Sequence, residues 1–132
     1  MTRQDQKEVI AIFKDILNLK DNWNQYGAMA FNSNFVYAIQ EIVLNFKNKP
    51  DNIVPTGRES IQIEYGYKED LYLELNFYQD NNLVIFLNYL DAAQNSHYVY
   101  LKKGGQIIPK DHIIINGISD MIKELKNNDA RN

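Results

Sequence analysis

The chain has 132 residues and a mass of 15.5 kDa, enough for one domain, 1–132, whose core needs no cross-links. Hydrophobic residues make up 45% of it and charged residues 23%, which excludes intrinsic disorder as the default. The formal charge of −3 lacks the basic excess of nucleic-acid-binding proteins, and the absence of cysteine excludes disulfides, thiol catalysis and thiolate metal sites.

No targeting or membrane-spanning segment is visible. The N-terminal residues contain no apolar run after Arg3, so no secretory signal is expected. No apolar stretch approaches the roughly 20 residues that a transmembrane helix needs. We therefore expect a cytoplasmic protein without a membrane partner, and a sequence without cysteine is compatible with a reducing compartment.

Two amphipathic helices are predicted in the first part of the chain, over about 4–19 and 34–47. Thr2 is the expected N-cap of the first, and Asn32 or Ser33 that of the second. In each, apolar residues recur at three- and four-residue steps and must be buried against another element. These residues are Val9, Ile12, Phe13, Ile16 and Leu17 in the first helix, and Phe35, Ile39, Ile42, Val43 and Phe46 in the second.

The segment between the two helices, 20–30, is rich in Asp, Asn and Gly, which favour turns. It contains the single tryptophan, Trp23, together with Tyr26 and Gly27. We expect a loop whose two aromatic side chains close the bottom of the core, with the indole N–H bonded locally. The alternative is that this loop forms part of a recognition site, since loops carry function more often than cores do.

A four-stranded antiparallel meander is predicted next, after an extended connector over 51–58 that contains a proline. The strands are expected at about 59–65, 71–78, 83–90 and 97–101. The first two alternate strictly between apolar and polar residues, and the third is apolar on both faces, as in a central strand. A three-residue loop between the second and third strands would keep their apolar residues on one face. The expected pairs are Tyr78 with Val84 and Phe77 with Ile85.

The two faces of this meander differ in chemistry. The apolar face, which the helices are expected to cover, consists of Ile61, Ile63, Leu71, Leu73, Leu75, Phe77, Leu83, Ile85 and Leu87. The other face mixes tyrosines with carboxylates and amides, and tyrosine is enriched in protein interfaces because it buries much area at low entropic cost. We predict a binding surface there, made of Glu64, Tyr72, Glu74, Tyr78, Phe86, Tyr98 and Tyr100. Cross-strand aromatic pairing that only stabilises the sheet is the alternative.

The last predicted helix runs over about 111–126 and is followed by a polar tail, 127–132. Asn116-Gly117 interrupts it, at a cost of about 1 kcal/mol in helix propensity relative to alanine. Alternatively, 112–115 forms a strand and a shorter helix follows. The expected fold class is therefore α+β, with two N-terminal helices, a four-stranded antiparallel meander and a C-terminal helix, and with the helices on one face of the sheet.

Residue types that carry catalysis form no recognisable pattern in this sequence. His97 and His112 are not spaced with a serine or a carboxylate as in a catalytic triad, nor with other ligands as in a metal site. Glu64 and Glu74 lie diagonally on adjacent strands if Glu64 pairs with Tyr72. They could then act as acid and base in glycoside chemistry, but a flat sheet face supplies no cleft. We expect no catalytic residues, no metal and no cofactor, and favour a non-enzymatic role.

Residues 22–28, Asn-Trp-Asn-Gln-Tyr-Gly-Ala, resemble a segment that often reads N-W-D-G-Y-G-A in a family of small bacterial and phage proteins. The order of features is similar too, from the first helix to a strand that carries a Glu-aromatic pair, here Glu64-Tyr65. The resemblance covers roughly 19–75, with Asn24 and Gln25 where the segment often has aspartate and glycine. It implies no particular activity. It draws attention to Trp23, Tyr26, Gly27 and Glu64.

The leading functional hypothesis is a non-enzymatic protein-binding module of a bacterial or phage accessory system, of the immunity, antitoxin or anti-defence type. It rests on small size, acidity, the lack of catalytic signatures and the Tyr/Glu-rich sheet face. The alternative is a small-ligand-binding protein or hydrolase with a pocket between the Trp23 loop and the sheet, and Glu64 as polar anchor. A homodimer formed through the sheet is a third hypothesis. Nucleic acid is not expected as a partner.

Overall fold

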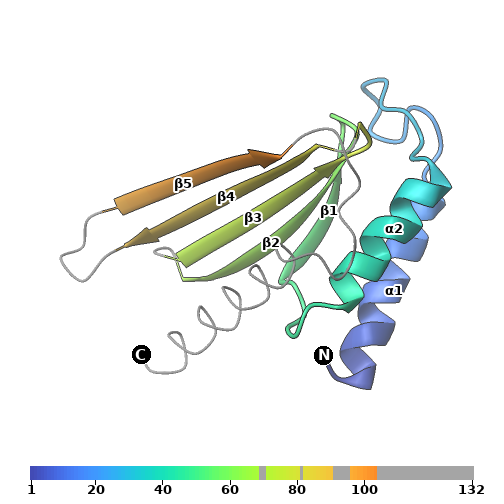
Figure 1. The fold of residues 1–132 in the computed structure, drawn as a ribbon. Helices are drawn as coiled ribbons and strands as arrows, with labels where there is room; N and C mark the ends of the chain where they lie inside the picture. The colour runs from blue at the N-terminus through green and yellow to red at the C-terminus, as the bar shows by residue number, and fades with distance from the viewer. Residues whose placement is uncertain (69–70, 81, 91–95, 104–132) are drawn as a thin grey trace.

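The computed structural model describes residues 1–68, 71–80, 82–90 and 96–103 (Figure 1). The elements in chain order are helices α1 (Arg3–Leu17) and α2 (Ser33–Leu44) and strands β1 (Asn52–Thr56), β2 (Ser60–Lys68), β3 (Leu71–Tyr78), β4 (Leu83–Leu90) and β5 (Ser96–Lys103). The strands form one antiparallel sheet in chain order, so the predicted α+β class is confirmed for this part of the chain. The predicted C-terminal helix, its alternative strand over 112–115 and the tail 127–132 lie outside the described residues.

Both described helices begin at capping residues that the sequence indicates. At α1, the Asp5 N–H donates to Thr2 Oγ1 (3.0 Å) and the Thr2 N–H donates to Asp5 Oδ2 (3.1 Å), which forms a capping box. The backbone hydrogen bond from Thr2 holds the pKa of Asp5 below its usual value. At α2, Asn32 Oδ1 accepts from the Asn34 N–H at 2.9 Å. Both helices end earlier than predicted, at asparagine C-caps.

The described sheet has five strands, one more than predicted, because the expected connector forms β1. This strand pairs with β2 from Asn52 opposite Glu64 to Thr56 opposite Ser60. It includes a proline, which is compatible with an edge strand because no second neighbour needs the missing N–H. Glu59, predicted to start the next strand, instead lies in the β1–β2 turn with φ 62°, typical of a three-residue hairpin loop.

The register of β3 and β4 differs from the predicted one by two residues. The predicted pairs Tyr78–Val84 and Phe77–Ile85 are wrong. The Tyr78 N–H donates to Asn82 O (2.9 Å), which leaves three residues between these two positions. A shift of two residues leaves every side chain on its predicted face, because side chains alternate with a period of two. The observed pairs include Phe77 with Leu83 and Leu75 with Ile85.

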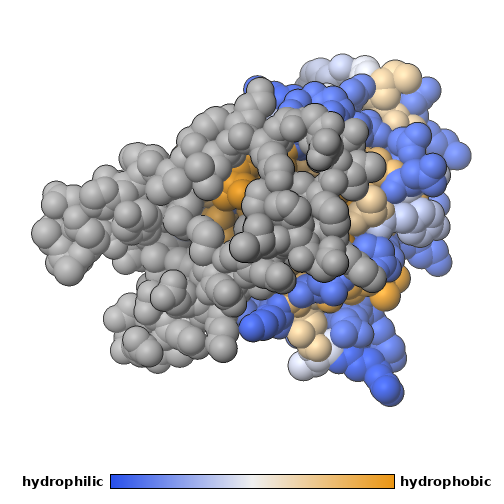
Figure 2. Space-filling view, viewed as in Figure 1, coloured by the Kyte–Doolittle hydropathy of each residue, from blue (hydrophilic) through white to orange (hydrophobic). Residues whose placement is uncertain are grey.

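The apolar face of the sheet and the helix pair form one hydrophobic core (Figure 1). All the residues predicted for that face whose side chains are described are buried, namely Ile61, Ile63, Leu73, Leu75, Phe77, Leu83 and Ile85. Val9, Phe13 and Ile16 of α1 and Val36, Ile39, Ile42 and Val43 of α2 join them, as does Tyr65. In Figure 2 the surface over the helices is mainly hydrophilic. α1 and α2 therefore cover the apolar face of the sheet.

Candidate binding surface

The predicted binding residues whose side chains are described, Glu64, Tyr72, Glu74, Tyr78 and Phe86, are all partly exposed. Their even numbering places them on the sheet face opposite the core, because the odd-numbered residues of β2, β3 and β4 whose side chains are described are buried. Two further predicted residues lie on β5 at matching register positions, Tyr100 opposite Phe86 and Tyr98 opposite Asn88. We call this side of the sheet the polar face.

Glu64 and Glu74 lie directly opposite each other on β2 and β3. The diagonal arrangement expected from a Glu64–Tyr72 pair is wrong, because Tyr72 lies opposite Gly66. Two like charges in directly paired positions destabilise a sheet unless neighbouring groups compensate for them. The stability of this carboxylate pair therefore depends on the groups that bind its four oxygen atoms.

Uncharged side chains donate to all four carboxylate oxygens. Glu64 accepts from Gln62 Nε2 (2.6 Å) and from Asn52 Nδ2 (3.2 Å). Glu74 accepts from the Tyr72 hydroxyl (2.8 Å) and from Asn76 Nδ2 (2.6 Å). These donors come from β1, β2 and β3, so the network spans three strands. It stabilises the carboxylates by hydrogen bonds alone and leaves their charges in place.

Tyr72 links the carboxylate pair to an aromatic contact. Its ring lies 6.2 Å from that of Phe86, between centroids, with the planes inclined by 59°. It also lies over Gly66, where an added Cβ would come within 3.1 Å of the tyrosine ring. Burial raises the pKa of the Tyr72 hydroxyl above its usual value, and the hydrogen bond to Glu74 and the charges of both carboxylates raise it further. Tyr72 is therefore a hydrogen-bond donor at neutral pH.

No described cation forms an ion pair with Glu64 or Glu74. The ion pair found among the described residues joins Lys49 to Glu8, and so links α1 to the segment after α2. Their hydrogen bond lowers the pKa of Glu8 and raises that of Lys49. The polar face thus carries two negative charges with hydrogen-bond partners but without a described counterion.

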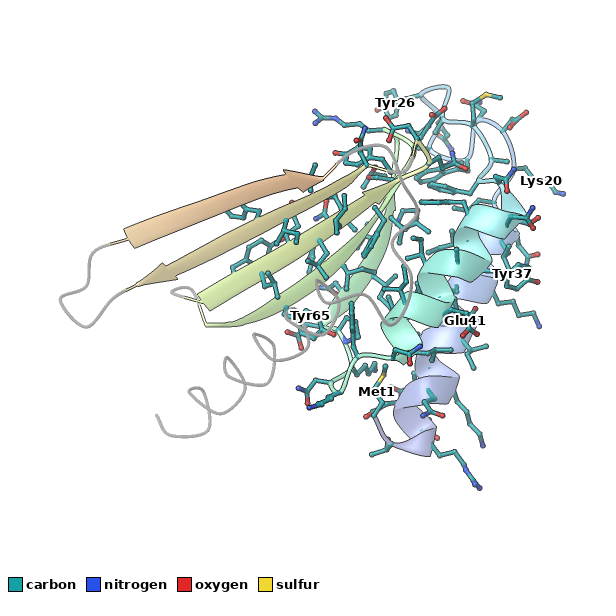
Figure 3. The ribbon with its side chains drawn as sticks, viewed as in Figure 1. Met1, Lys20, Tyr26, Tyr37, Glu41 and Tyr65 are labelled. Atoms are coloured by element: carbon teal, nitrogen blue, oxygen red, sulfur yellow. The ribbon has the colours of Figure 1, made fainter. Side chains whose placement is uncertain are left out.

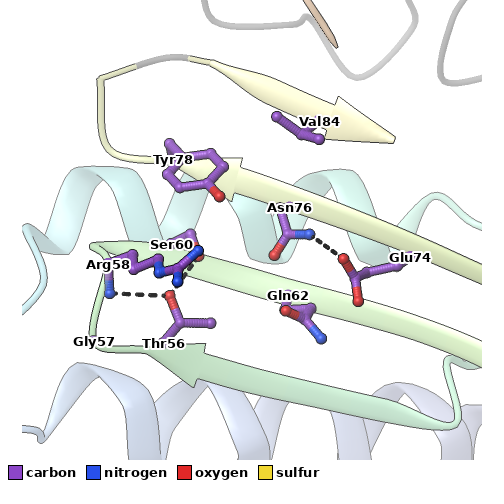
Figure 4. Close-up of a pocket in the computed structure, with 9 residues that line it drawn as sticks. All are labelled: Thr56, Gly57, Arg58, Ser60, Gln62, Glu74, Asn76, Tyr78 and Val84. Atoms are coloured by element: carbon purple, nitrogen blue, oxygen red, sulfur yellow. Dashed lines mark hydrogen bonds between the residues drawn. The ribbon is translucent and has the colours of Figure 1, made fainter. Parts of the chain in front are cut away.

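A cavity of about 500 Å³ lies at one end of the polar face, beside the β1–β2 turn (Figure 4). Its lining residues are Thr56, Gly57, Arg58, Ser60, Gln62, Glu74, Asn76, Tyr78 and Val84. Two polar residues of this lining are buried, Ser60 at 1% exposure and Asn76 at 6%. Thr56 Oγ1 and Ser60 Oγ are hydrogen-bonded at 2.5 Å, and the Arg58 N–H donates to Thr56 Oγ1 at 3.3 Å. The alternative hypothesis expected a pocket between the Trp23 loop and the sheet, but no residue of that loop lines this cavity.

The Trp23 loop has one aromatic side chain against the core and one in solvent. Trp23 packs on the core with its ring centroid 6.2 Å from that of Phe31, and its indole N–H donates to Met29 O at 3.2 Å. This confirms the expected role of Trp23. Tyr26, by contrast, is 92% exposed, so the prediction that it closes the core is wrong (Figure 3).

Two asparagine side chains organise the backbone of this loop. Asn24 Oδ1 accepts from the N–H groups of Tyr26 (2.9 Å) and Ala28 (3.0 Å), and Asn22 Oδ1 accepts from the Gly27 N–H at 2.9 Å. Asparagine supplies the same acceptor oxygen that aspartate would. Gln25 and Gly27 both have positive φ, 65° and 87°, where glycine carries no steric cost.

The loop also contacts the turn that borders the cavity. A Cβ added to Gly57 would lie 2.8 Å from Asn24 Nδ2, so the Asn24 side chain can lie against the backbone of residue 57 because that residue is glycine. The Asn32 N–H, at the start of α2, donates to Gln79 Oε1 (2.7 Å), in the turn after β3. The two surfaces that the sequence proposed as rivals are therefore joined at Gly57.

The structure places no catalytic or metal-binding constellation among the residues it describes. His97 lies in β5, and His112 is outside the described residues. The described part of the chain contains no group of three or more acidic or histidine side chains placed to hold a metal ion. None of its helices combines the length and apolarity required to cross a bilayer.

Sequence reasoning missed the cavity, because its residues come from the turn and from strand positions that are distant in sequence. The signal that could have found it is the β-branched pair Ile53-Val54, which favours a strand, followed by a turn that contains Gly57. Comparison with known protein families, with curated proteins and with solved structures finds no match to this chain.

Proposed function

We propose that this protein is a non-enzymatic protein-binding module that contacts a basic surface of its partner through the polar face of the sheet. As a biological setting we propose a bacterial or phage accessory system of the immunity, antitoxin or anti-defence type. The observation that carries the proposal is the Glu64–Glu74 pair, which is directly opposed in register and has no described counterion.

A cationic partner would bring the charge that the described residues do not supply. The two carboxylates repel each other across the strands, and an approaching Lys or Arg would remove part of that repulsion. Complementary charges also speed up encounter and exclude partners of the same sign. The net charge of −3 acts in the same direction. A basic protein surface is therefore the partner of best electrostatic fit.

The aromatic residues around the carboxylates supply contact area. Tyr72 and Phe86 lie in contact with each other and are partly exposed. Such residues bury apolar area on binding and, in tyrosine, keep a polar end for hydrogen bonds. Aromatic residues are enriched at the centre of protein interfaces, and the carboxylates beside them here would select a partner of opposite charge.

The test compares two variants that each lose two negative charges. One carries Glu64→Gln and Glu74→Gln on the polar face. The other carries Asp15→Asn on the exposed side of α1 and Glu41→Gln on that of α2; Figure 3 labels Glu41. Each is used, beside the unmodified protein, to capture partners from the host cell at low and high salt.

We expect capture of a basic protein that falls at least tenfold in the polar-face variant, is unchanged in the helix variant and weakens with salt. Equal capture by both variants would contradict the proposed surface, as would loss in the helix variant alone. Absence of any specifically captured protein would contradict the proposed function.

A further inference from the structure

The floor of the cavity is rich in hydrogen-bond acceptors. Asn76 donates through Nδ2 to Glu74 Oε2 at 2.6 Å, and this bond fixes the orientation of its carboxamide, since the oxygen would repel the carboxylate. Asn76 Oδ1 therefore points away from Glu74, toward the Gln62 side of the cavity (Figure 4). No described donor forms a hydrogen bond with this oxygen, although only 6% of the residue's surface is exposed.

Glu74 adds further acceptor capacity beside Asn76. Each of its oxygens accepts one hydrogen bond, from Tyr72 or Asn76, and a carboxylate oxygen can accept two. Gln62 donates through Nε2 to Glu64, so the orientation of its amide is fixed in the same way and its Oε1 is an acceptor. Buried acceptors without donors are costly, and native proteins keep them where a ligand or water supplies the donor.

We infer that this cavity is an anchor pocket for an arginine side chain of the partner protein, held by Glu74 and Asn76. This inference rests on the proposed function. A guanidinium offers five N–H donors in one plane, so it can bond to a carboxylate and an adjacent amide oxygen at the same time. An ammonium group makes fewer directional bonds of this kind and is more strongly hydrated.

The shape and borders of the cavity agree with a planar cation. Its volume of about 500 Å³ is sufficient for an arginine side chain, with room for the adjoining backbone. The ring of Tyr78 forms one wall, and an aromatic face attracts a guanidinium. Arg58 lines the turn end of the cavity but is exposed, so water screens its charge. The bound guanidinium is therefore expected at the Glu74 end.

The test uses a small probe and needs no partner protein. Acetyl-arginine methylamide, which carries a guanidinium but no carboxylate, is added to the full chain while the side-chain amide signals of Asn76 and Gln62 are followed by NMR. The neutral isostere acetyl-citrulline methylamide and the corresponding lysine compound are the comparison ligands. Glu74→Gln is the test variant, and Glu41→Gln, which removes the same charge on the exposed side of α2 and outside the cavity lining, is the matched control.

We expect saturable shifts of the Asn76 signals with the arginine probe, no saturation with citrulline and at least threefold weaker binding of lysine. Glu74→Gln should weaken arginine binding at least fivefold, and the distant Glu41→Gln less than about twofold. No saturable shift in the unmodified protein would overturn the inference, as would equal binding of citrulline or equal effects of the two variants.

The two proposals fail in different ways. Arginine binding in the cavity, together with unchanged partner capture by the polar-face variant, would leave the pocket in place and refute the proposed interface. Partner capture that depends on Glu64 and Glu74, without arginine binding, would support the interface and refute the pocket.

Discussion

Replacing Glu64, Glu74 or both with glutamine measures the repulsion between two carboxylates that the sheet places opposite each other. Directly paired residues on one face have Cβ atoms about 5 Å apart. With an effective dielectric constant of about 60, between the values for a protein surface and for water, Coulomb's law gives about 1 kcal/mol. Each single substitution also weakens the hydrogen bonds that the carboxylate accepts. Only the interaction term of the double-mutant cycle isolates the repulsion.

We expect urea unfolding at low ionic strength to give an unfavourable interaction term of about 1 kcal/mol between Glu64 and Glu74. The term should fall below about 0.3 kcal/mol near 1 M NaCl, where the Debye length is about 3 Å. A double-mutant cycle between Glu64 and Glu41 serves as control, because Glu41 lies on the exposed side of α2 (Figure 3). Its interaction free energy should be zero. A zero or favourable term for Glu64 and Glu74 at low salt would refute the reasoning, because the two charges would then not repel each other across the strands.

Three further predictions concern the Trp23 loop and the network on the polar face. Gln25→Gly should raise the free energy of unfolding by about 0.5–1 kcal/mol, since residue 25 has a φ of 65°; a lower urea midpoint than that of the unmodified protein would contradict this. Asn24→Ala should lower the free energy of unfolding by about 1–2 kcal/mol, because two backbone N–H groups lose their acceptor, whereas Asn24→Asp keeps that oxygen and should change it by less than half as much. Tyr72 has a raised pKa in the folded state, so its contribution to stability is complete below the unfolded-state pKa of about 10 and is lost as the pH rises toward the folded-state value. Tyr72→Phe should therefore remove part of the fall in unfolding free energy above pH 10, and equal slopes for both proteins in denaturation at pH 9–11 would argue against this assignment.

The sequence by itself determined the local structure and the two faces of the sheet. Thr2 and Asn32 cap helices because a short polar side chain there reaches N–H groups that have no helical partner. The alternation along β2 and β3 fixes which side chains are buried, since the period of a strand is two residues. For the same reason, Leu75 and Ile85 must share a face, and this requirement determines whether the β3–β4 connection has an odd or an even number of residues.

The tertiary structure alone decided the arrangement that matters for the candidate site. A shift of two residues along a strand keeps every side chain on its face, so the pattern could not determine that Glu64 lies opposite Glu74. The segment 52–56 contains a proline, and only its position at the sheet edge makes it a strand. Trp23 and Tyr26 have similar chemistry in the sequence, yet the folded loop buries one against Phe31 and exposes the other. Asn76 is only 6% exposed, although the alternation of its strand alone predicts an exposed polar residue at this position. Pairing partners and exposure depend on contacts between residues distant in the chain, and local periodicity carries no information about them.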